Sequence, residues 1–192
     1  MRITFLNQKG GVGKSTVSIL IGAALQSAGY RVAFDDQDPQ QSLRLWASQV
    51  GGLPLLENSP ENDIIICDTP GRLDLNHPTS LSQLIAISHR NIVVCEKSLF
   101  STHASVPMVE FLKRHQRPGA RSCVLFNKVR STTLVGKQNA AELSADLGLP
   151  ALHNFLPLAA PFENVQTMGF NAVTGKHREL VLTLALEILK ES

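Results

Sequence analysis

The sequence is poor in cysteine, in aromatic residues and in long apolar runs. Only three cysteines and 5% aromatic residues occur among the 192 residues. Cys67, Cys95 and Cys123 match no metal-binding spacing, and each lies in an apolar stretch typical of a buried strand. No run of about 18 apolar residues predicts a transmembrane helix, and a predicted strand at the start leaves no room for a signal peptide. We therefore expect a cytoplasmic protein without a transmembrane segment.

Acidic residues are missing from one long part of the chain. Between Glu110 and Glu142 there is no Asp or Glu, but there are seven Lys or Arg. Residues 1–96 carry seven Lys or Arg and nine Asp or Glu, a net charge of −2, whereas residues 97–192 carry eleven and seven, a net charge of +4. A stretch of one sign suits a polyanion partner or an ordinary solvated surface, and charge alone does not separate the two.

Strand-like apolar runs alternate with helix-like runs along the whole chain. This alternation predicts one α/β domain over residues 1–192, in which a mostly parallel sheet lies between two helical layers. The expected strands are 2–7, 31–35, 63–67, 91–95, 121–126 and 151–156. The expected helices are 15–28, 40–49, 79–88, 102–115, 136–147, 161–168 and 175–190.

A glycine-rich segment connects the first strand to the first helix: Lys9-Gly10-Gly11-Val12-Gly13-Lys14-Ser15-Thr16. Its glycines let backbone N–H groups converge on phosphate oxygens, and the helix directs its positive end at the same anion. It fits most of the G-x-x-x-x-G-K-[ST] pattern, although the first position falls on Gln8. We therefore expect a P-loop NTPase fold in which Lys14 reaches the β- and γ-phosphates and Ser15 ligates Mg²⁺.

Two further strands end in carboxylates. Asp35 ends the second strand, with Asp36 and Asp38 directly after it, and Asp68 follows the aliphatic strand 63–67. Beside a phosphate loop, we expect Asp68 to meet Mg²⁺, Asp38 to orient the attacking water and Asp36 to support the outer shell of the metal. The alternative for the acidic segment is a turn whose Asp caps the following helix. Gly71 would offer a backbone N–H to the γ-phosphate.

Taken together, these motifs resemble the ParA/MinD family of deviant Walker A ATPases. The family loop K-G-G-x-G-K-[ST]-[ST] is met at residues 9–16, and D-x-D-P-Q is met at residues 36–40. The likeness continues through Phe126-Asn127-Lys128-Val129 and Leu156-Pro157, and the chain looks like the small ParA type, which includes plasmid-partition ATPases and carboxysome-spacing McdA proteins. The segment between Trp46 and Asp68 is shorter than in many relatives.

The resemblance implies site roles beyond those read from the loop itself. Lys9 would cross a homodimer interface to the partner's nucleotide, and catalysis would rest on Lys9, Lys14 and Asp38. Thr16 would contact the α-phosphate. Asn127 and the backbone near Pro157 would hold the adenine of ATP.

The implied function is a nucleoid-associated ATPase that dimerises on ATP and binds nonspecific DNA. It would position or segregate a plasmid or carboxysome with an adaptor protein, ParB-like or McdB-like, that stimulates hydrolysis. The candidate DNA-binding residues are Arg114, Arg117, Arg130, Lys137, Lys176 and Arg178.

Three alternative functions fit the sequence less well. A MinD-like membrane-cycling ATPase needs a basic amphipathic C-terminal helix, whereas helix 175–190 is apolar over most of its circumference, which favours packing against the sheet. A metabolic enzyme that activates a small acid with ATP would need its own acid/base groups, but the six histidines are scattered. An iron–sulfur reductase would need cluster cysteines on loops rather than in strands.

Overall fold

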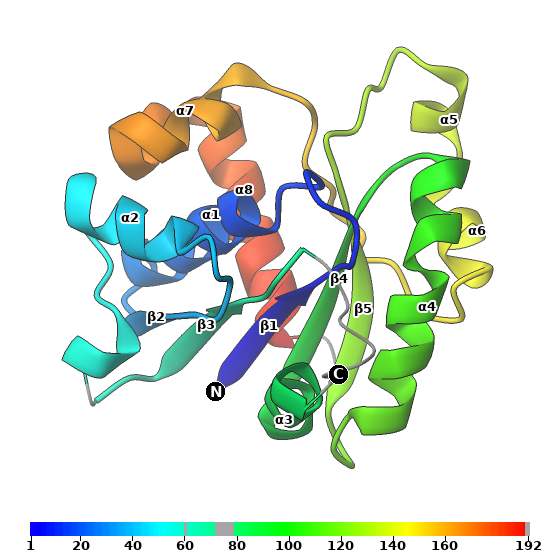
Figure 1. Cartoon of the computed structure of the whole chain (residues 1–192). Coiled ribbons are helices and arrows are strands. Elements are labelled where there is room, and N and C mark those ends of the chain that lie inside the picture. The colour runs from blue at the N-terminus through cyan, green and yellow to red at the C-terminus, as the bar shows by residue number, and fades with distance from the viewer. Residues whose placement is uncertain (60, 72–78, 191–192) are drawn as a thin grey trace.

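The computed structural model describes residues 1–59, 61–71 and 79–190. Their centre is a parallel sheet of five strands in the order β2-β3-β1-β4-β5. The order places β1 in the middle, so the loop that follows it lies over the centre of one sheet edge (Figure 1). The strands are β1 (Arg2–Leu6), β2 (Val32–Asp36), β3 (Ile64–Asp68), β4 (Arg90–Glu96) and β5 (Arg121–Asn127).

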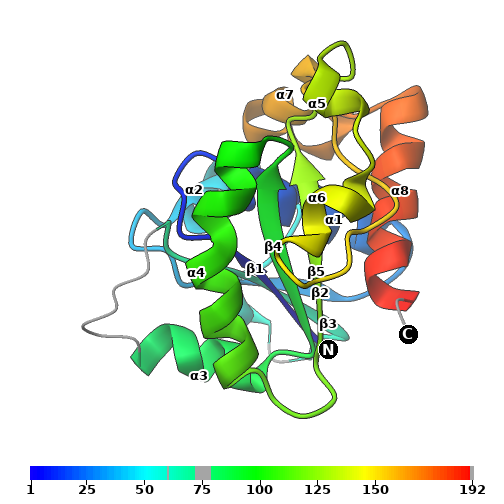
Figure 2. The ribbon, with the colours of Figure 1, turned by 90° about the vertical axis from the view of Figure 1, so that its right-hand side faces the viewer.

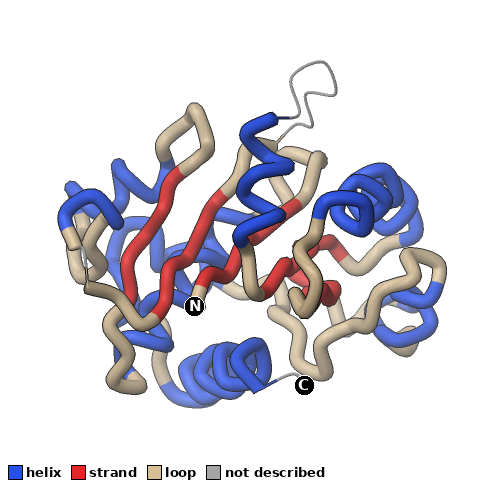
Figure 3. The backbone as a smooth tube through the Cα atoms, turned by 90° about the horizontal axis from the view of Figure 1, so that it is seen from below, coloured by secondary structure: helices blue, strands red, loops and turns tan. Residues whose placement is uncertain are grey.

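Helices cover both faces of this sheet and make the three layers visible in Figures 2 and 3. This arrangement confirms the α/β fold predicted from the alternation of runs. One face carries α1 (Lys14–Ser27), α2 (Ser42–Gln49), α7 (Ala160–Met168) and α8 (Gly175–Lys190). The other side carries α3 (Thr79–Ile87), α4 (Leu99–His115), α5 (Leu134–Lys137) and α6 (Ala140–Ala145). Two short 3₁₀ helices are η1 (Leu56–Asn58) and η2 (Gly169–Ala172).

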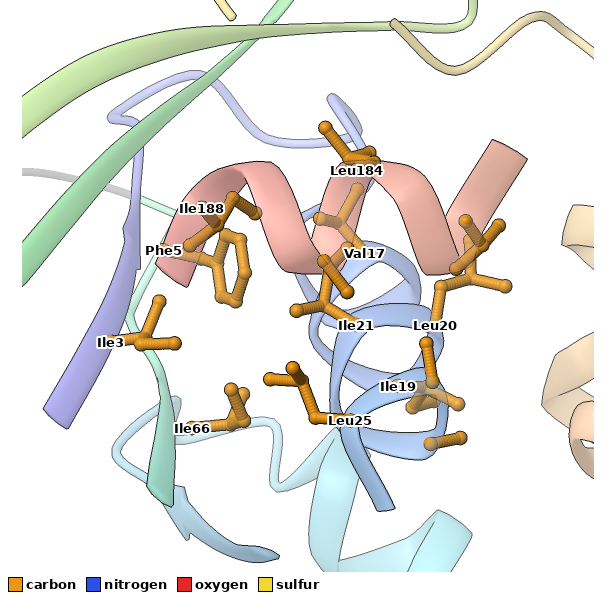
Figure 4. Packing of buried hydrophobic residues seen from close by; sticks show 14 of the residues in the cluster. Ile3, Phe5, Val17, Ile19, Leu20, Ile21, Leu25, Ile66, Leu184 and Ile188 are labelled. Carbon is orange, nitrogen blue, oxygen red and sulfur yellow. The ribbon is translucent and has the colours of Figure 1, made fainter. Parts of the chain in front are cut away.

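The larger core lies between the sheet and the pair α1 and α8 (Figure 4). Apolar residues recur in α1 at helical spacing, so Val17 and Ile21 face the buried Phe5 of β1 and the buried Leu184 and Ile188 of α8. The apolar face of α8 is thus covered by α1 and the sheet, as expected from the sequence. Among the described residues, no helix is long and apolar enough to cross a membrane.

The prediction of a sixth strand over 151–156 is wrong. This segment runs beside β5 but makes only one isolated bridge, Val124 to Ala151, and a second isolated bridge, Val129 to Pro157, lies directly after it. The reason lies in α8, because the Glu187 carboxylate accepts the backbone N–H groups of His153 at 2.5 Å and Asn154 at 3.2 Å. Donors that bond a side chain no longer contribute to a ladder, so the segment stays irregular.

The predicted helix 136–147 is also wrong, because two short helices replace it. Gln138 has an extended backbone (φ −59°, ψ 155°) that ends α5. The Asn139 side chain then accepts the N–H of Ala141 at 2.9 Å and caps α6. Asn is a favoured N-cap residue, and here it restarts the helix that the apolar periodicity had suggested was continuous.

Candidate functional site

The glycine-rich loop lies at the carboxyl edge of the parallel sheet, between β1 and α1 (Figure 1). Gly11 and Gly13 have φ of 78° and 94°, which residues with a side chain rarely adopt. Gly13 is the N-cap of α1, and the first turn of that helix contains no acidic residue. The N–H groups and positive dipole end of α1 are therefore left for an external anion.

Lys14 is 6% exposed and lies at the floor of the site. Burial lowers the pKa of its ammonium, and the charges of Asp68 and Asp38 partly offset that effect. Lys14 lines the same cavity as the loop glycines, so its ammonium is positioned to meet a phosphate bound there.

Asp68 is fully buried at the end of β3. The Ser15 hydroxyl donates to its Oδ2 at 2.5 Å, whereas Oδ1 is buried without a hydrogen-bond partner in the part of the chain described here. Burial raises the pKa of this carboxyl to about 6, against the lowering effects of the Ser15 hydrogen bond and the Lys14 charge. An unpartnered carboxylate oxygen beside a hydroxyl is the oxygen donor set that Mg²⁺ takes in proteins.

No group of three or more His, Cys, Asp or Glu that could hold a metal ion occurs within residues 1–59, 61–71 and 79–190. This fits Mg²⁺, which is commonly bound by one or two protein ligands while phosphates and water complete its shell. Ser15 and Asp68 are therefore the residues of this site whose oxygens could hold a Mg²⁺ ion.

The acidic residues at the end of β2 and directly after it have different contacts. Both oxygens of Asp36 accept backbone N–H groups, from Asp38 at 3.2 Å and from Arg44 at 2.9 Å, so Asp36 caps α2. Asp35 forms an ion pair with Arg2. Asp38 lines the cavity, with its Oδ1 accepting the N–H of Gln40 at 3.0 Å. Of the three carboxylates, Asp38 is the one that borders the space beside Lys14.

A cavity of about 480 Å³ begins at the loop and extends toward α7. Gly71 closes its loop end, since a Cβ at that position would lie 3.6 Å from the Gly10 Cα and 3.7 Å from the Lys14 Nζ. The structure thus brings most of the predicted site together. The predicted residues that line the cavity are Gly10, Gly11, Gly13, Lys14, Ser15, Thr16, Asp38, Gly71, Asn127 and Pro157.

Four of the predicted nucleotide- and metal-site residues do not line the cavity: Lys9, Val12, Asp36 and Asp68, of which the two aspartates are described above. Val12 is buried beneath the loop, and its carbonyl accepts the Asn127 Nδ2 at 2.9 Å. The Lys9 Nζ lies 3.5 Å from the Glu96 Oε2, with 40% of the Lys9 side chain exposed. Lys9 therefore stands at the rim, where a second molecule could reach it.

Residues that sequence reasoning missed come from distant segments. Gln166 of α7 donates to the Thr16 hydroxyl at 3.1 Å, and Phe162 of the same helix lines the cavity. Lys128 donates to the Gly11 carbonyl at 2.7 Å. Lys128 lies in a segment that resembles the family, but no local pattern predicts the contacts of these residues with the loop, because those contacts depend on how α7 and the end of β5 pack.

The six candidate DNA-binding residues fall into two groups. Arg114 lies in the last turn of α4, and Arg117 follows that helix, at the sheet edge opposite the glycine-rich loop (Figure 2). Arg130, Lys137, Lys176 and Arg178 lie near the start of α8 or around α5, toward the loop edge. Arg114 pairs with Glu110 at 3.5 Å, and the Arg178 guanidinium lies 4.6 Å from the centre of the Phe170 ring.

Comparisons with known proteins agree with this geometry. A model of the CobQ/CobB/MinD/ParA nucleotide binding domain matches residues 3–168. The Maintenance of carboxysome distribution protein A of Gloeobacter kilaueensis is 27% identical over 184 residues, covering 88% of this chain and 82% of that protein.

Two solved structures share the fold at low identity. MinD cell division protein of Aquifex aeolicus has a TM-score of 0.76 at 15% identity, covering 100% of this chain and 98% of that one. The septum site-determining protein MinD of Pyrococcus horikoshii, complexed with Mg-ADP, has a TM-score of 0.73 at 16% identity, covering 98% and 96%.

Proposed function

Because this chain belongs to the CobQ/CobB/MinD/ParA family of nucleotide-binding domains, we propose that it is a small ParA-type ATPase. With ATP and Mg²⁺ bound it dimerises, binds nonspecific DNA, and positions or segregates a plasmid or carboxysome. An adaptor protein on the cargo stimulates hydrolysis. The similarity to a carboxysome distribution protein, over 88% of this chain and 82% of that protein, supports this class of function.

One observation carries the nucleotide part of the proposal: the unpartnered Oδ1 of the buried Asp68, beside Ser15 and Lys14. A buried carboxylate oxygen without a donor is costly, and a bound cation removes that cost. Ser15 and Asp68 would hold Mg²⁺, and Asp36, which caps α2, would support its outer shell. When bound, Mg²⁺ would neutralise charge that develops on the phosphates.

The remaining site residues act on the nucleotide itself. The N–H groups of the loop and Lys14 bind the phosphates, Thr16 meets the α-phosphate, and the backbone of Gly71 meets the γ-phosphate. Asn127 and the backbone near Pro157 hold the adenine. Asp38 positions the attacking water, since it is the carboxylate of its segment that borders the cavity beside Lys14.

Lys9 serves the dimer in this proposal. It leaves Glu96 and binds the phosphates of the partner's nucleotide, which links assembly to the presence of ATP. The membrane-cycling alternative is not favoured, because the apolar face of α8 is buried against α1 and the sheet.

Two substitutions test the ATPase. Asp38→Ala should keep ATP binding, slow hydrolysis by at least about 100-fold and accumulate dimers in analytical ultracentrifugation. Lys14→Ala should abolish nucleotide binding in titration calorimetry. Normal hydrolysis by Asp38→Ala would show that another group positions the water.

DNA binding is tested separately, by the salt dependence of ATP-dependent binding to a duplex of arbitrary sequence. Phosphate contacts predict a steep loss of affinity with salt, and removal of each contact lowers the slope by about one. The pairs Arg114→Ala/Arg117→Ala and Lys176→Ala/Arg178→Ala examine the two edges independently. Salt-insensitive binding, or no binding with ATP, would contradict this part of the proposal.

A further inference from the structure

Two consecutive residues at the end of β5 reach across to the phosphate loop. The Asn127 Nδ2 donates to the Val12 carbonyl at 2.9 Å, and the Lys128 Nζ donates to the Gly11 carbonyl at 2.7 Å. These acceptors lie 115 and 117 positions earlier in the chain. The contacts therefore tie the loop to a strand on the far side of β4 rather than to its own neighbours.

The backbone of Lys128 is unusual in a way that serves this contact. Its φ is +54°, a left-handed conformation that is unfavourable for a residue with a Cβ. The following residue, Val129, nevertheless remains paired, because its N–H bonds the Leu156 carbonyl at 3.0 Å and its carbonyl accepts the N–H of Leu158 at 3.0 Å. The kink at Lys128 thus lets the chain continue beside 156–158 while the lysine side chain reaches the loop. Strain of this kind is a reason to look for a function.

Asn127 and Lys128, here called the clamp, pack tightly against the phosphate loop. A Cβ at Gly13 would lie 2.5 Å from the Asn127 Nδ2 and 3.8 Å from the Lys128 Cε. Both clamp residues also line the 480 Å³ cavity. The Lys128 ammonium is therefore at the rim of the space in which the phosphates would lie.

We propose that Lys128 is a positioning residue that holds the Gly11 carbonyl outward, so that the N–H groups of the loop stay directed at the phosphates. This inference rests on the proposed nucleotide binding and extends it to a residue outside the loop motif. A loop fixed before binding loses less conformational freedom when the nucleotide arrives, so affinity rises. The ammonium also adds positive charge beside the anion.

Three substitutions at this position separate the charged side-chain contact with Gly11 from the backbone strain. Lys128→Met keeps the alkyl stem and the strained backbone but removes the bond to Gly11. Lys128→Gly removes the bond and also relieves the strain. Lys128→Arg restores a cation that can donate to the same carbonyl. Lys113→Met is the matched control, because the Lys113 Nζ also bonds a backbone carbonyl, that of Leu147, at 3.3 Å and far from the loop.

Affinity for ATP and for ADP with Mg²⁺ is measured by calorimetry, and the thermal midpoint is measured without nucleotide. Lys128→Met should lower the affinity for ATP and for ADP by about 5- to 10-fold. Lys128→Arg should have affinities within about 2-fold of those of the original protein. Lys128→Gly should lose affinity like the methionine variant while its thermal midpoint lies above that variant's. Lys113→Met should leave affinity unchanged.

The outcomes separate this inference from the function on which it rests. If the unmodified chain binds neither ATP nor ADP, the proposed function fails. If it binds them and Lys128→Met binds equally well, the positioning role is overturned while the function stands. If the loss of nucleotide affinity is proportional to the fall in thermal midpoint across all four variants, Lys128 only stabilises the fold, and the inference is overturned as well.

Discussion

Replacing Asp68 by Asn should make the protein more stable while it loses its response to magnesium and nucleotide. Burial raises the pKa of the Asp68 carboxyl from an ordinary 3.8 to about 6. At about 1.4 kcal/mol per pKa unit, the ionised carboxylate costs about 3 kcal/mol in the folded state at neutral pH. The Asn amide oxygen can still accept the Ser15 hydroxyl, so the substitution removes the charge and keeps that hydrogen bond.

The raised pKa of Asp68 determines how the stability of the protein changes with pH. Because the folded-state pKa lies above the unfolded value, the cost is absent below pH 3.8 and complete above about pH 6. Asp68→Asn should therefore match the original protein in acid and exceed it at neutral pH. In a chain of this length the gain corresponds to a rise in Tm of roughly 6–12 °C.

The assay is urea unfolding in a chelator, without nucleotide, across this pH range, followed by thermal unfolding with Mg²⁺ and ATP. Asp63→Asn is the matched control at the other end of β3, because the exposed Asp63 has its pKa lowered to about 2 by Arg31. Its stabilising contribution is present above pH 3.8 and is lost as pH falls through about 2, so Asp63→Asn should destabilise at neutral pH. An Asp68→Asn variant that is less stable than the original, or that responds fully to Mg²⁺ and ATP, would refute the reasoning.

Three further predictions concern the rim of the site and the core. Glu96→Gln releases Lys9 from its ion pair and should lower the ATP concentration that gives half-maximal dimerisation by about 2- to 5-fold, as measured by ultracentrifugation; an unchanged concentration would mean that the pair does not restrain Lys9. Glu187→Ala leaves the N–H groups of His153 and Asn154 without their acceptor and should cost about 2–3 kcal/mol in urea unfolding. Leu184→Ala opens a cavity where the side chain is fully buried and should cost about 3 kcal/mol in the same assay, and a loss below about 1 kcal/mol in either variant would contradict the packing described.

The sequence could predict those parts of the site that consist of neighbouring residues in the chain. The loop from Lys9 to Thr16 and the carboxylate that ends β3 are local patterns, and a parallel sheet places the ends of its strands at one edge. For the same reason Asp38 could be expected beside the loop. The alternation of apolar runs was sufficient for the layers and for the burial of the α8 face.

The parts that could not be predicted depend on contacts between distant segments. Gln166 meets Thr16 across 150 positions and Lys128 meets Gly11 across 117, and neither contact has a local signal. Residues 151–156 have the composition of a strand, but Glu187 takes two of their N–H groups from 33 or 34 positions away. In each case tertiary hydrogen bonding decides what local propensity leaves open.

The irregular segments beside the two outer strands have a consequence for behaviour in a crowded cell. Along β2, the Phe34 N–H bonds the Pro54 carbonyl at 2.9 Å. Along β5, the Val124 N–H bonds the Pro150 carbonyl at 2.8 Å and its carbonyl accepts the N–H of Leu152 at 2.9 Å. Both segments bond backbone N–H or C=O groups of an outer strand, but they form no regular strand to which another could add. Their prolines also lack the N–H group that an added strand would need. The two outer strands should therefore resist strand-to-strand pairing with other copies of the chain at high concentration.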